Sequence, residues 1–161
     1  MSDPSIVRRE VAAQPILLIR RTTTRATLAE ALGDCFGKLF SLGHGQGLPV
    51  SGWPVARYVA MGPGLWTIEA AMPVAEPVSA QSLGDAEIEA GMLHAGAVAF
   101  AVHSGSYQTL PQTHAAIEAW IKSQGYEVAG APWESYVTDP GKHPNPADWK
   151  TEVFWPLKAS S

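Results

Sequence analysis

Two stretches of the 161-residue chain repeat the same short pattern, and this repetition constrains the fold more than any other sequence feature. The segment Pro54–Tyr58 (PVARY) matches the segment Pro132–Tyr136 (PWESY). A Trp, a Glu and a Pro then recur with identical spacing: Trp66, Glu69 and Pro73 match Trp149, Glu152 and Pro156. The shared order indicates an internal duplication, although chance similarity between two αβ units would give the same match. We expect duplicated halves to pack about a pseudo-twofold axis and to leave a concave ligand groove between them.

Hydrophobic periodicity predicts the order strand–helix–strand–strand in each half, which makes the chain an α+β protein. The predicted strands are 15–20, 56–61, 65–74, 95–102, 133–138 and 150–157. The predicted helices begin near Leu28 and Thr109, and Gly125 is expected to end the second. We expect residues 1–10 to be a flexible tail and 11–158 to be a single domain, with repeat one at about 11–75 and repeat two at about 95–158.

Composition and charge exclude several classes of protein. Eleven Lys and Arg against fifteen Asp and Glu give a net charge of −4, and without a basic cluster we expect no direct nucleic-acid binding. The uninterrupted apolar run 95–102 is far shorter than the roughly 20 residues that a membrane span needs. The polar N-terminus does not resemble a secretory signal. The single cysteine, Cys35, lies on an apolar helix face and is expected in the core. These features favour a cytoplasmic protein without membrane contact.

No motif for a cofactor is present. The sequence has neither a GxxxxGK[ST] phosphate loop nor a GxGxxG fingerprint, and the glycine-rich segment Gly43–Gly47 follows a helix rather than a strand. Its five histidines are scattered, and no HExxH pattern occurs. We therefore expect neither a cofactor nor a metal.

Aromatic residues are frequent, with six Trp and four Tyr. Several of them fall on predicted strands or at strand ends: Trp53, Trp66, Trp133, Trp155, Tyr58, Tyr107 and Tyr136. Aromatic side chains around a cleft suit flat apolar ligands. The same residues would equally serve as core or edge packing, so the pattern alone leaves both uses open.

Glu134 is the acidic residue of greatest interest. In an alternating strand it shares a face with Tyr136, while Trp133 lies on the opposite face. A desolvated carboxylate there would attract a cation or act as a general acid or base. Alternation alone favours a solvent-facing Glu134. For Glu69 and Glu152 we expect outward or edge charges.

An ordered set of features in the second half resembles the GyrI-like (gyrase-inhibitor-like) small-molecule-binding domain. This domain also forms the effector-binding module of some MerR-type and AraC-type multidrug regulators. The features are, in order, Val102–Tyr107, a helix ending at Trp120 and Ile121, Gly125, Pro132–Tyr136, Asp139 with Pro140, Thr151 with Glu152, and Trp155–Leu157. The resemblance covers about residues 11–158 and is strongest from residue 97 onward.

The resemblance implies a duplicated fold with a groove between its halves. It implies that Glu134 is the pocket glutamate and that Tyr107 and Tyr136 lie near it. We name Trp66 and Trp133 as further candidate walls, although Trp133 faces away from Glu134 in a regular strand. Since only about ten residues precede the first predicted strand, we expect a stand-alone member without a DNA-binding domain.

Stand-alone members of this family resemble three kinds of bacterial protein. We expect first a binder of planar hydrophobic, including cationic, drug- or toxin-like compounds, which would serve toxin resistance. The alternative is a hydrolase that opens strained cyclopropane rings of DNA-alkylating natural products, with Glu134 and Tyr136 as its catalytic residues. A third alternative is an inhibitor or protector of DNA gyrase, so gyrase or a regulator remains open as a protein partner.

Overall fold

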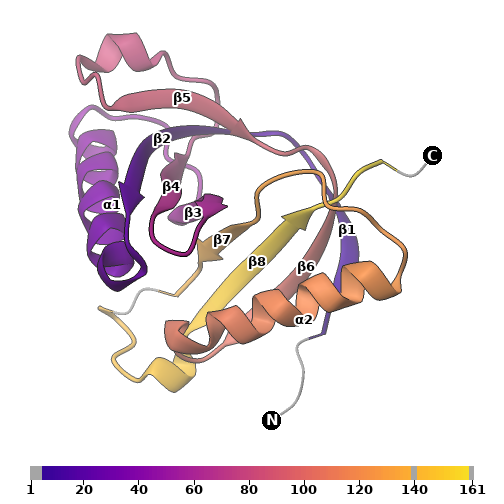
Figure 1. Cartoon of the computed structure of the whole chain (residues 1–161). Coiled ribbons are helices and arrows are strands. Elements are labelled where there is room, and N and C mark those ends of the chain that lie inside the picture. Colours follow the sequence, from indigo (N-terminus) through magenta and orange to yellow (C-terminus); the bar gives the residue numbers. More distant parts are fainter. Residues whose placement is uncertain (1–4, 139–140, 160–161) are drawn as a thin grey trace. The chain divides into compact units, whose positions relative to one another are not determined.

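The computed structural model describes residues 5–138 and 141–159, in which the chain forms two compact units (Figure 1). The first unit is Ala13–His94. The second unit is formed by the described residues up to Ala12 together with those from Ala95 onward. Each unit is a four-stranded antiparallel sheet with one long helix. The predicted α+β class and the duplicated strand–helix–strand–strand order are confirmed.

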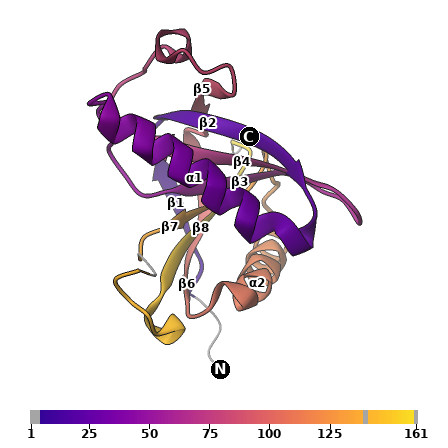
Figure 2. The same ribbon diagram turned by 90° about the vertical axis from the view of Figure 1, so that its left-hand side faces the viewer.

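In the first unit the sheet order is β3-β4-β2-β5. Its elements are β2 (Gln14–Thr23), α1 (Leu28–Gly45), β3 (Val55–Met61), β4 (Trp66–Pro73) and β5 (Ile88–Leu93), with short 3₁₀ turns at Arg25–Thr27 and Ala80–Leu83. Helix α1 lies across the sheet (Figure 2) and packs on β2 and β4. Its buried stripe includes Leu32, Cys35 and Leu39, so the predicted core position of Cys35 is confirmed.

In the second unit the sheet order is β1-β6-β8-β7. Its elements are β1 (Val7–Val11), β6 (Gly96–Ser104), α2 (Leu110–Ser123), β7 (Trp133–Tyr136) and β8 (Lys150–Pro156), with 3₁₀ turns at Tyr107–Thr109 and Pro146–Asp148. Helix α2 packs on β6 and β8, and one hydrophobic core joins them. Gly125, with a φ of 75°, follows the end of α2 as predicted, because a left-handed backbone there favours glycine.

Strand register supports the duplication residue by residue. Arg57 lies opposite Glu69 in the β3/β4 pair, and Ser135 lies opposite Glu152 in the β7/β8 pair. These are the residues that the sequence match aligns. On the other side of β4 and β8, Arg20 pairs with Glu69 and Val102 with Glu152, so both sheets have the same register as well as the same strand order.

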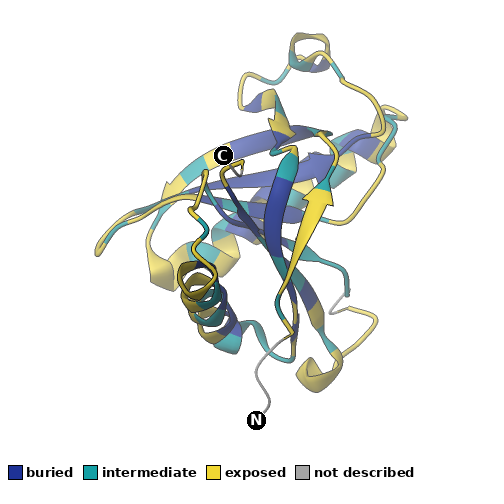
Figure 3. Ribbon diagram, turned by 90° about the vertical axis from the view of Figure 1, so that its right-hand side faces the viewer, coloured by how far each residue is buried: buried dark blue, intermediate teal, exposed yellow. Residues whose placement is uncertain are grey.

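Two edge strands were not predicted. The flexible tail expected at 1–10 is wrong for residues 7–10, which belong to β1 and pair with β6; residues 1–4 lie outside the described residues. Strand β5, which pairs with β2, was also missed. An edge strand has one neighbour and buries little, so its sequence need not alternate. Figure 3 shows β1 as an exposed strand beside the largely buried β6.

A glycine marks the middle of β5. A Cβ on Gly91 would lie 2.9 Å from Cδ2 of Leu18 on the neighbouring strand β2. The close approach of the Leu18 side chain explains a glycine at this position of the strand.

Among the described residues, no helix is long and apolar enough to cross a membrane.

Candidate functional site

Glu134 is buried beneath helix α2 and only 2% exposed. It pairs with Val153, a member of the core under α2, whereas its neighbour Trp133 pairs with Phe154 on the opposite face. The solvent-facing position that alternation alone favours is therefore wrong. The strand does alternate, but the face that carries Glu134 is the one that the helix covers.

Two side chains donate hydrogen bonds to the Glu134 carboxylate. The Tyr136 hydroxyl donates to Oε1 at 2.6 Å, and Nε2 of His114 on α2 lies 2.7 Å from Oε2. The indole N–H of Trp155 on β8 donates to Nδ1 of His114 at 3.0 Å. A continuous polar chain therefore runs from β8 through α2 to β7, and we call these four residues the Glu134 network.

The donors and acceptors in the Glu134 network fix the state of His114. An indole N–H only donates, so Nδ1 of His114 accepts and carries no proton. The proton of the neutral imidazole therefore sits on Nε2 and is donated to Glu134. In this arrangement Glu134 accepts from both Tyr136 and His114 as a carboxylate.

From Tyr136 of the Glu134 network, a row of aromatic rings continues to Tyr107 and Trp149, and all three rings are half-buried. The ring centroids of Tyr107 and Tyr136 lie 5.4 Å apart, and those of Tyr107 and Trp149 lie 4.7 Å apart. The indole N–H of Trp149 donates to the His143 carbonyl at 2.6 Å, which fixes the ring plane. The aromatic row Tyr136–Tyr107–Trp149 is thus half-buried along its length and begins beside the buried carboxylate.

The structure brings together three of the five predicted site residues: Glu134, Tyr136 and Tyr107. Trp133 lies on the other face of the sheet, where it is 4% exposed and stacks on Phe154 with a centroid distance of 5.0 Å. Trp66 belongs to the first unit and makes an edge contact with Tyr58 at 6.0 Å. The motif residues Asp139 and Pro140 lie outside the described residues.

Sequence reasoning missed His114, Trp149 and Trp155 as site residues. The spacing of Leu110, His114, Ile117 and Ile121 places His114 on the apolar stripe of α2. A histidine within an apolar stripe must find a buried partner, and this signal was present in the sequence. Which partner it finds depends on the pairing of β7 with β8, which the sequence does not give.

The equivalent positions of the first unit are apolar. The strand register aligns Glu134 with Ala56 and Trp155 with Met72. The spacing of buried residues in the two helices aligns His114 with Leu32. All three residues of the first unit are buried. The core between helix and sheet therefore contains no charged side chain at these positions in one repeat and contains a carboxylate in the other. Since the fold does not require the Glu134 network, the network is the strongest candidate for function.

His103, by contrast, has a structural role. Its Nε2 donates to the Ser106 carbonyl at 2.9 Å, and its Nδ1 lies 2.6 Å from the Thr113 hydroxyl on α2. The ring is 6% exposed and ties the end of β6 to the first turns of the helix.

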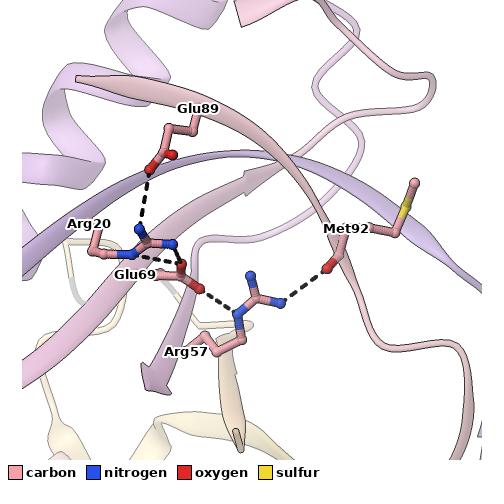
Figure 4. A network of polar contacts seen from close by, with 5 residues as sticks. All are labelled: Arg20, Arg57, Glu69, Glu89 and Met92. Atoms are coloured by element: carbon pink, nitrogen blue, oxygen red, sulfur yellow. Dashed lines mark hydrogen bonds and ion pairs between the residues drawn. The ribbon is translucent and has the colours of Figure 1, made fainter. Parts of the chain in front are cut away.

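The first unit carries its own buried glutamate on the sheet face that α1 leaves uncovered. Glu69 is 3% exposed, so the expectation of an outward charge is wrong. Arg20 donates to Oε2 at 2.7 Å and Arg57 donates to Oε1 at 2.6 Å (Figure 4). Arg57 also donates to the Met92 carbonyl, and Arg20 lies 3.8 Å from Glu89. Burial raises the pKa of Glu69, but the two guanidiniums outweigh it and hold the pKa below its usual value.

His114→Leu tests the energetic coupling within the Glu134 network. This change introduces the residue that the first unit uses and should lower the free energy of unfolding by about 2 kcal/mol, because a buried carboxylate loses a donor. Adding Glu134→Leu should recover part of the loss, giving a coupling of about 1–3 kcal/mol in a double-mutant cycle measured by urea unfolding. Additive losses would show that the two side chains are energetically independent.

The chain belongs to the GyrI-like family, and the model of the GyrI-like small molecule binding domain matches residues 3–158. Sequence comparison with curated proteins gives no match. Among the described residues, no group of three His, Cys, Asp or Glu side chains is placed to hold a metal ion.

Solved structures share the fold at low sequence identity. The C-terminal domain of EcmrR aligns with a TM-score of 0.79 at 16% identity, covering 98% of this chain and 99% of that domain. In the EcmrR–DNA complex the TM-score is 0.83 at 16% identity; the match covers 98% of this chain, which spans 58% of that longer chain. A hydrolase from Listeria innocua aligns with a TM-score of 0.69 at 14% identity, covering 98% and 94%. SAV2435 bound to tetraphenylphosphonium aligns with a TM-score of 0.61 at 11% identity, covering 96% and 94%.

Proposed function

We propose that this chain binds planar hydrophobic compounds, including cationic ones, with Glu134 as the charged anchor and the aromatic row as the contact surface. The observation that carries this proposal is the difference between the repeats. A buried carboxylate occupies a position where the sister repeat has alanine, and it lies next to half-buried aromatic rings.

Charge supports the cationic part of this class. The Tyr136 hydroxyl and the neutral His114 imidazole orient the Glu134 carboxylate without adding a positive charge to it. A carboxylate in a weakly polar environment attracts a cation more strongly than one in water. Tyrosine and tryptophan faces attract cations as well, so both parts of the site favour the same ligands.

Shape supports the planar part of this class. Tyr136, Tyr107 and Trp149 together offer flat apolar faces, which stack favourably on aromatic ligands. Because Glu134 is nearly fully buried, a compound that contacts it directly must displace a neighbouring side chain, and this movement costs part of the affinity. The related fold of SAV2435 in complex with tetraphenylphosphonium, an organic cation, supports the same ligand class.

The direct test compares two dyes of nearly the same shape and different charge. Purified protein is titrated with N-methylacridinium, a fixed cation, and with acridine at mildly alkaline pH, where acridine is neutral. We expect quenching of tryptophan fluorescence with both dyes and tighter binding of the cation. Equal affinities would remove the charged anchor from the proposal, and the absence of binding to either dye would overturn it.

Tyr107→Ala tests the aromatic row. Loss of a ring between two aromatic neighbours should weaken both acridine dyes by about two- to tenfold, because an aromatic pair contributes about 0.5–1.5 kcal/mol. Tyr126→Ala is the matched control: Tyr126 packs on Trp120 at 5.7 Å, beyond the other end of α2. If both variants bind the two dyes as the wild type does, the row does not contact ligand.

A hydrolase is the second candidate, and the His114–Glu134 hydrogen bond favours it. In this reaction Glu134 takes a proton from water, and the resulting hydroxide adds to one carbon of a strained cyclopropane ring. The carbon–carbon bond breaks, and its electron pair moves into the conjugated system attached to the ring, which is then protonated. Tyr136 and His114 hold the carboxylate for this step.

Turnover separates the two candidates. Incubation with a cyclopropane-bearing DNA alkylator is followed by mass spectrometry of the small molecule. A product heavier by one water, formed in molar excess over protein, would establish the hydrolase. Recovery of the intact compound together with saturable fluorescence quenching would establish a binder.

A further inference from the structure

Thr151 lies on strand β8 next to the Glu134 network. In the sheet it pairs with Tyr136 of β7 on one side and with His103 of β6 on the other. Its side chain shares the α2-covered face with Glu134 and Tyr136, because Thr151 and Val153 alternate in step with them. Thr151 is 0% exposed, and within residues 5–138 and 141–159 its Oγ1 has no hydrogen-bond partner.

A buried hydroxyl without a partner is unfavourable for folding. Such a group has lost its hydrogen bonds to water and gained none in return, which destabilises the folded state. The equivalent residue of the first unit is Ile68, also 0% exposed, which is β-branched like threonine but has no hydroxyl. The fold therefore accepts an apolar residue at this position, and packing does not explain the hydroxyl.

We propose that the Thr151 hydroxyl binds a polar group of the compound held at Glu134, so that this site selects planar compounds bearing an amino, hydroxyl or carbonyl group. The inference rests on the proposed ligand-binding function and specifies its ligand class. Cross-strand neighbours such as Tyr136 and Thr151 have Cβ atoms about 4.5–5.5 Å apart, and diagonal neighbours such as Glu134 and Thr151 have Cβ atoms somewhat less than about 7–8 Å apart. One tricyclic ring system spans these separations.

The chemistry of a hydroxyl gives this site its selectivity. Thr151 Oγ1 can donate one hydrogen bond and accept two, so it suits either a donor or an acceptor on the ligand. A purely hydrocarbon cation satisfies the Glu134 charge but leaves Thr151 without a partner. A compound with both features satisfies both groups, and the difference between two such compounds measures the contribution of Thr151.

Thr151→Val tests the proposal, because valine keeps the β-branched shape and removes only the hydroxyl. Two planar tricyclic cations serve as probes: proflavine, which carries amino groups, and N-methylacridinium, which carries none. We expect Thr151→Val to weaken proflavine about three- to tenfold, the effect of one lost hydrogen bond, and to leave the affinity for N-methylacridinium unchanged.

Thr113→Val is the matched control for folding. Thr113 is similarly buried, but its hydroxyl lies 2.6 Å from His103 Nδ1, so its loss should lower the urea midpoint of unfolding. Thr151→Val should leave that midpoint unchanged or raise it. A fall as large as that of Thr113→Val would mean that the hydroxyl serves the fold, which overturns the inference without any ligand measurement.

The dye measurements separate the inference from the proposed function. If both dyes bind the wild type and Thr151→Val changes neither affinity, or changes both equally, the inference is wrong and the proposed function stands. An unchanged proflavine affinity is also the result expected if Thr151 binds water alone. If neither dye binds the wild type, the proposed function fails and the inference fails with it.

Discussion

Glu134→Gln is expected to weaken the binding of N-methylacridinium about ten- to hundredfold while leaving the affinity for neutral acridine unchanged. The substitution removes the charge and keeps the shape, and an interaction with a charged group contributes about 1.5–3 kcal/mol. Titration of the wild type and of Glu134→Gln with each dye, followed by isothermal calorimetry or tryptophan fluorescence, measures this change in affinity. If the hydrolase reaction is found, the same substitution should abolish it, because an amide cannot take a proton from water.

The glutamine can keep the fold intact because the Glu134 network dictates its orientation. His114 donates from Nε2, so the amide oxygen of the glutamine must face His114. The amide nitrogen then faces Tyr136, whose hydroxyl oxygen can accept from it. We therefore expect the unfolding midpoint to change little, which separates loss of the charge from loss of structure.

Glu152→Gln is the matched control for this experiment. Glu152 lies on the same sheet, pairs with Ser135, and belongs to the face that α2 does not cover. The Glu152→Gln variant should bind both dyes as the wild type does. If the cation binds Glu134→Gln as tightly as the wild type, the carboxylate is not the anchor and the cationic ligand class is wrong.

Glu69→Ala is expected to have the largest effect on stability, lowering the free energy of unfolding by about 3 kcal/mol. The change leaves Arg57, whose side chain is only 19% exposed, without its buried carboxylate. Arg20 is 53% exposed and can turn toward water, so we place the loss at the lower end of the range for broken buried ion pairs. Urea unfolding of the two proteins near neutral pH measures it.

The pH dependence of this loss follows from the lowered pKa of Glu69. Burial raises the pKa of Glu69, but the hydrogen bonds and charges of Arg20 and Arg57 together lower it by more than burial raises it. A carboxyl whose pKa is lower in the folded than in the unfolded state stabilises the fold above its unfolded pKa. That contribution is lost as the pH falls through the folded pKa. The wild type should therefore lose stability in acid more steeply than Glu69→Ala, and their difference should shrink as the pH falls below the usual carboxyl range.

Glu152→Ala controls for the removal of a strand glutamate. Glu152 occupies the equivalent position in the second repeat, where Val102 and Ser135 stand in place of the two arginines. Its loss should change stability by no more than about 0.5 kcal/mol. A constant difference between the wild type and Glu69→Ala at every pH would contradict the ion-pair explanation.

The regular elements could be predicted because they follow from local sequence patterns. Two apolar stripes place the helices: Leu32, Cys35 and Leu39 in the first, and Leu110, Ile117 and Ile121 in the second. The matched Glu69 and Glu152 give the register of the repeats from the sequence alone. Strands β1 and β5 were not predicted, because an edge strand is held by a single ladder of hydrogen bonds and needs no alternating apolar face.

Burial of the glutamates could not be predicted from alternation. Alternation says that Glu134 and Trp133 face opposite ways, but helix α2 covers the face of Glu134 and Trp133 stacks on Phe154, so both residues are buried. Glu69 is buried because two arginines from neighbouring strands neutralise it, and strand pairing brings them together over long sequence separations. The resemblance to a family pointed to Glu134, Tyr107 and Tyr136, whereas the partnership of Glu134 with His114 and Trp155 emerged only from the folded chain.

The assignment of β1 to the second unit makes the two repeats interdependent. The strand that precedes repeat one in the chain completes the sheet of repeat two, and β5, which precedes repeat two, completes the sheet of repeat one. A chain cut between His94 and Ala95 would therefore not yield two self-sufficient halves. The C-terminal fragment, with its buried glutamate, would expose the edge of β6 and would need β1 from the other fragment to close it.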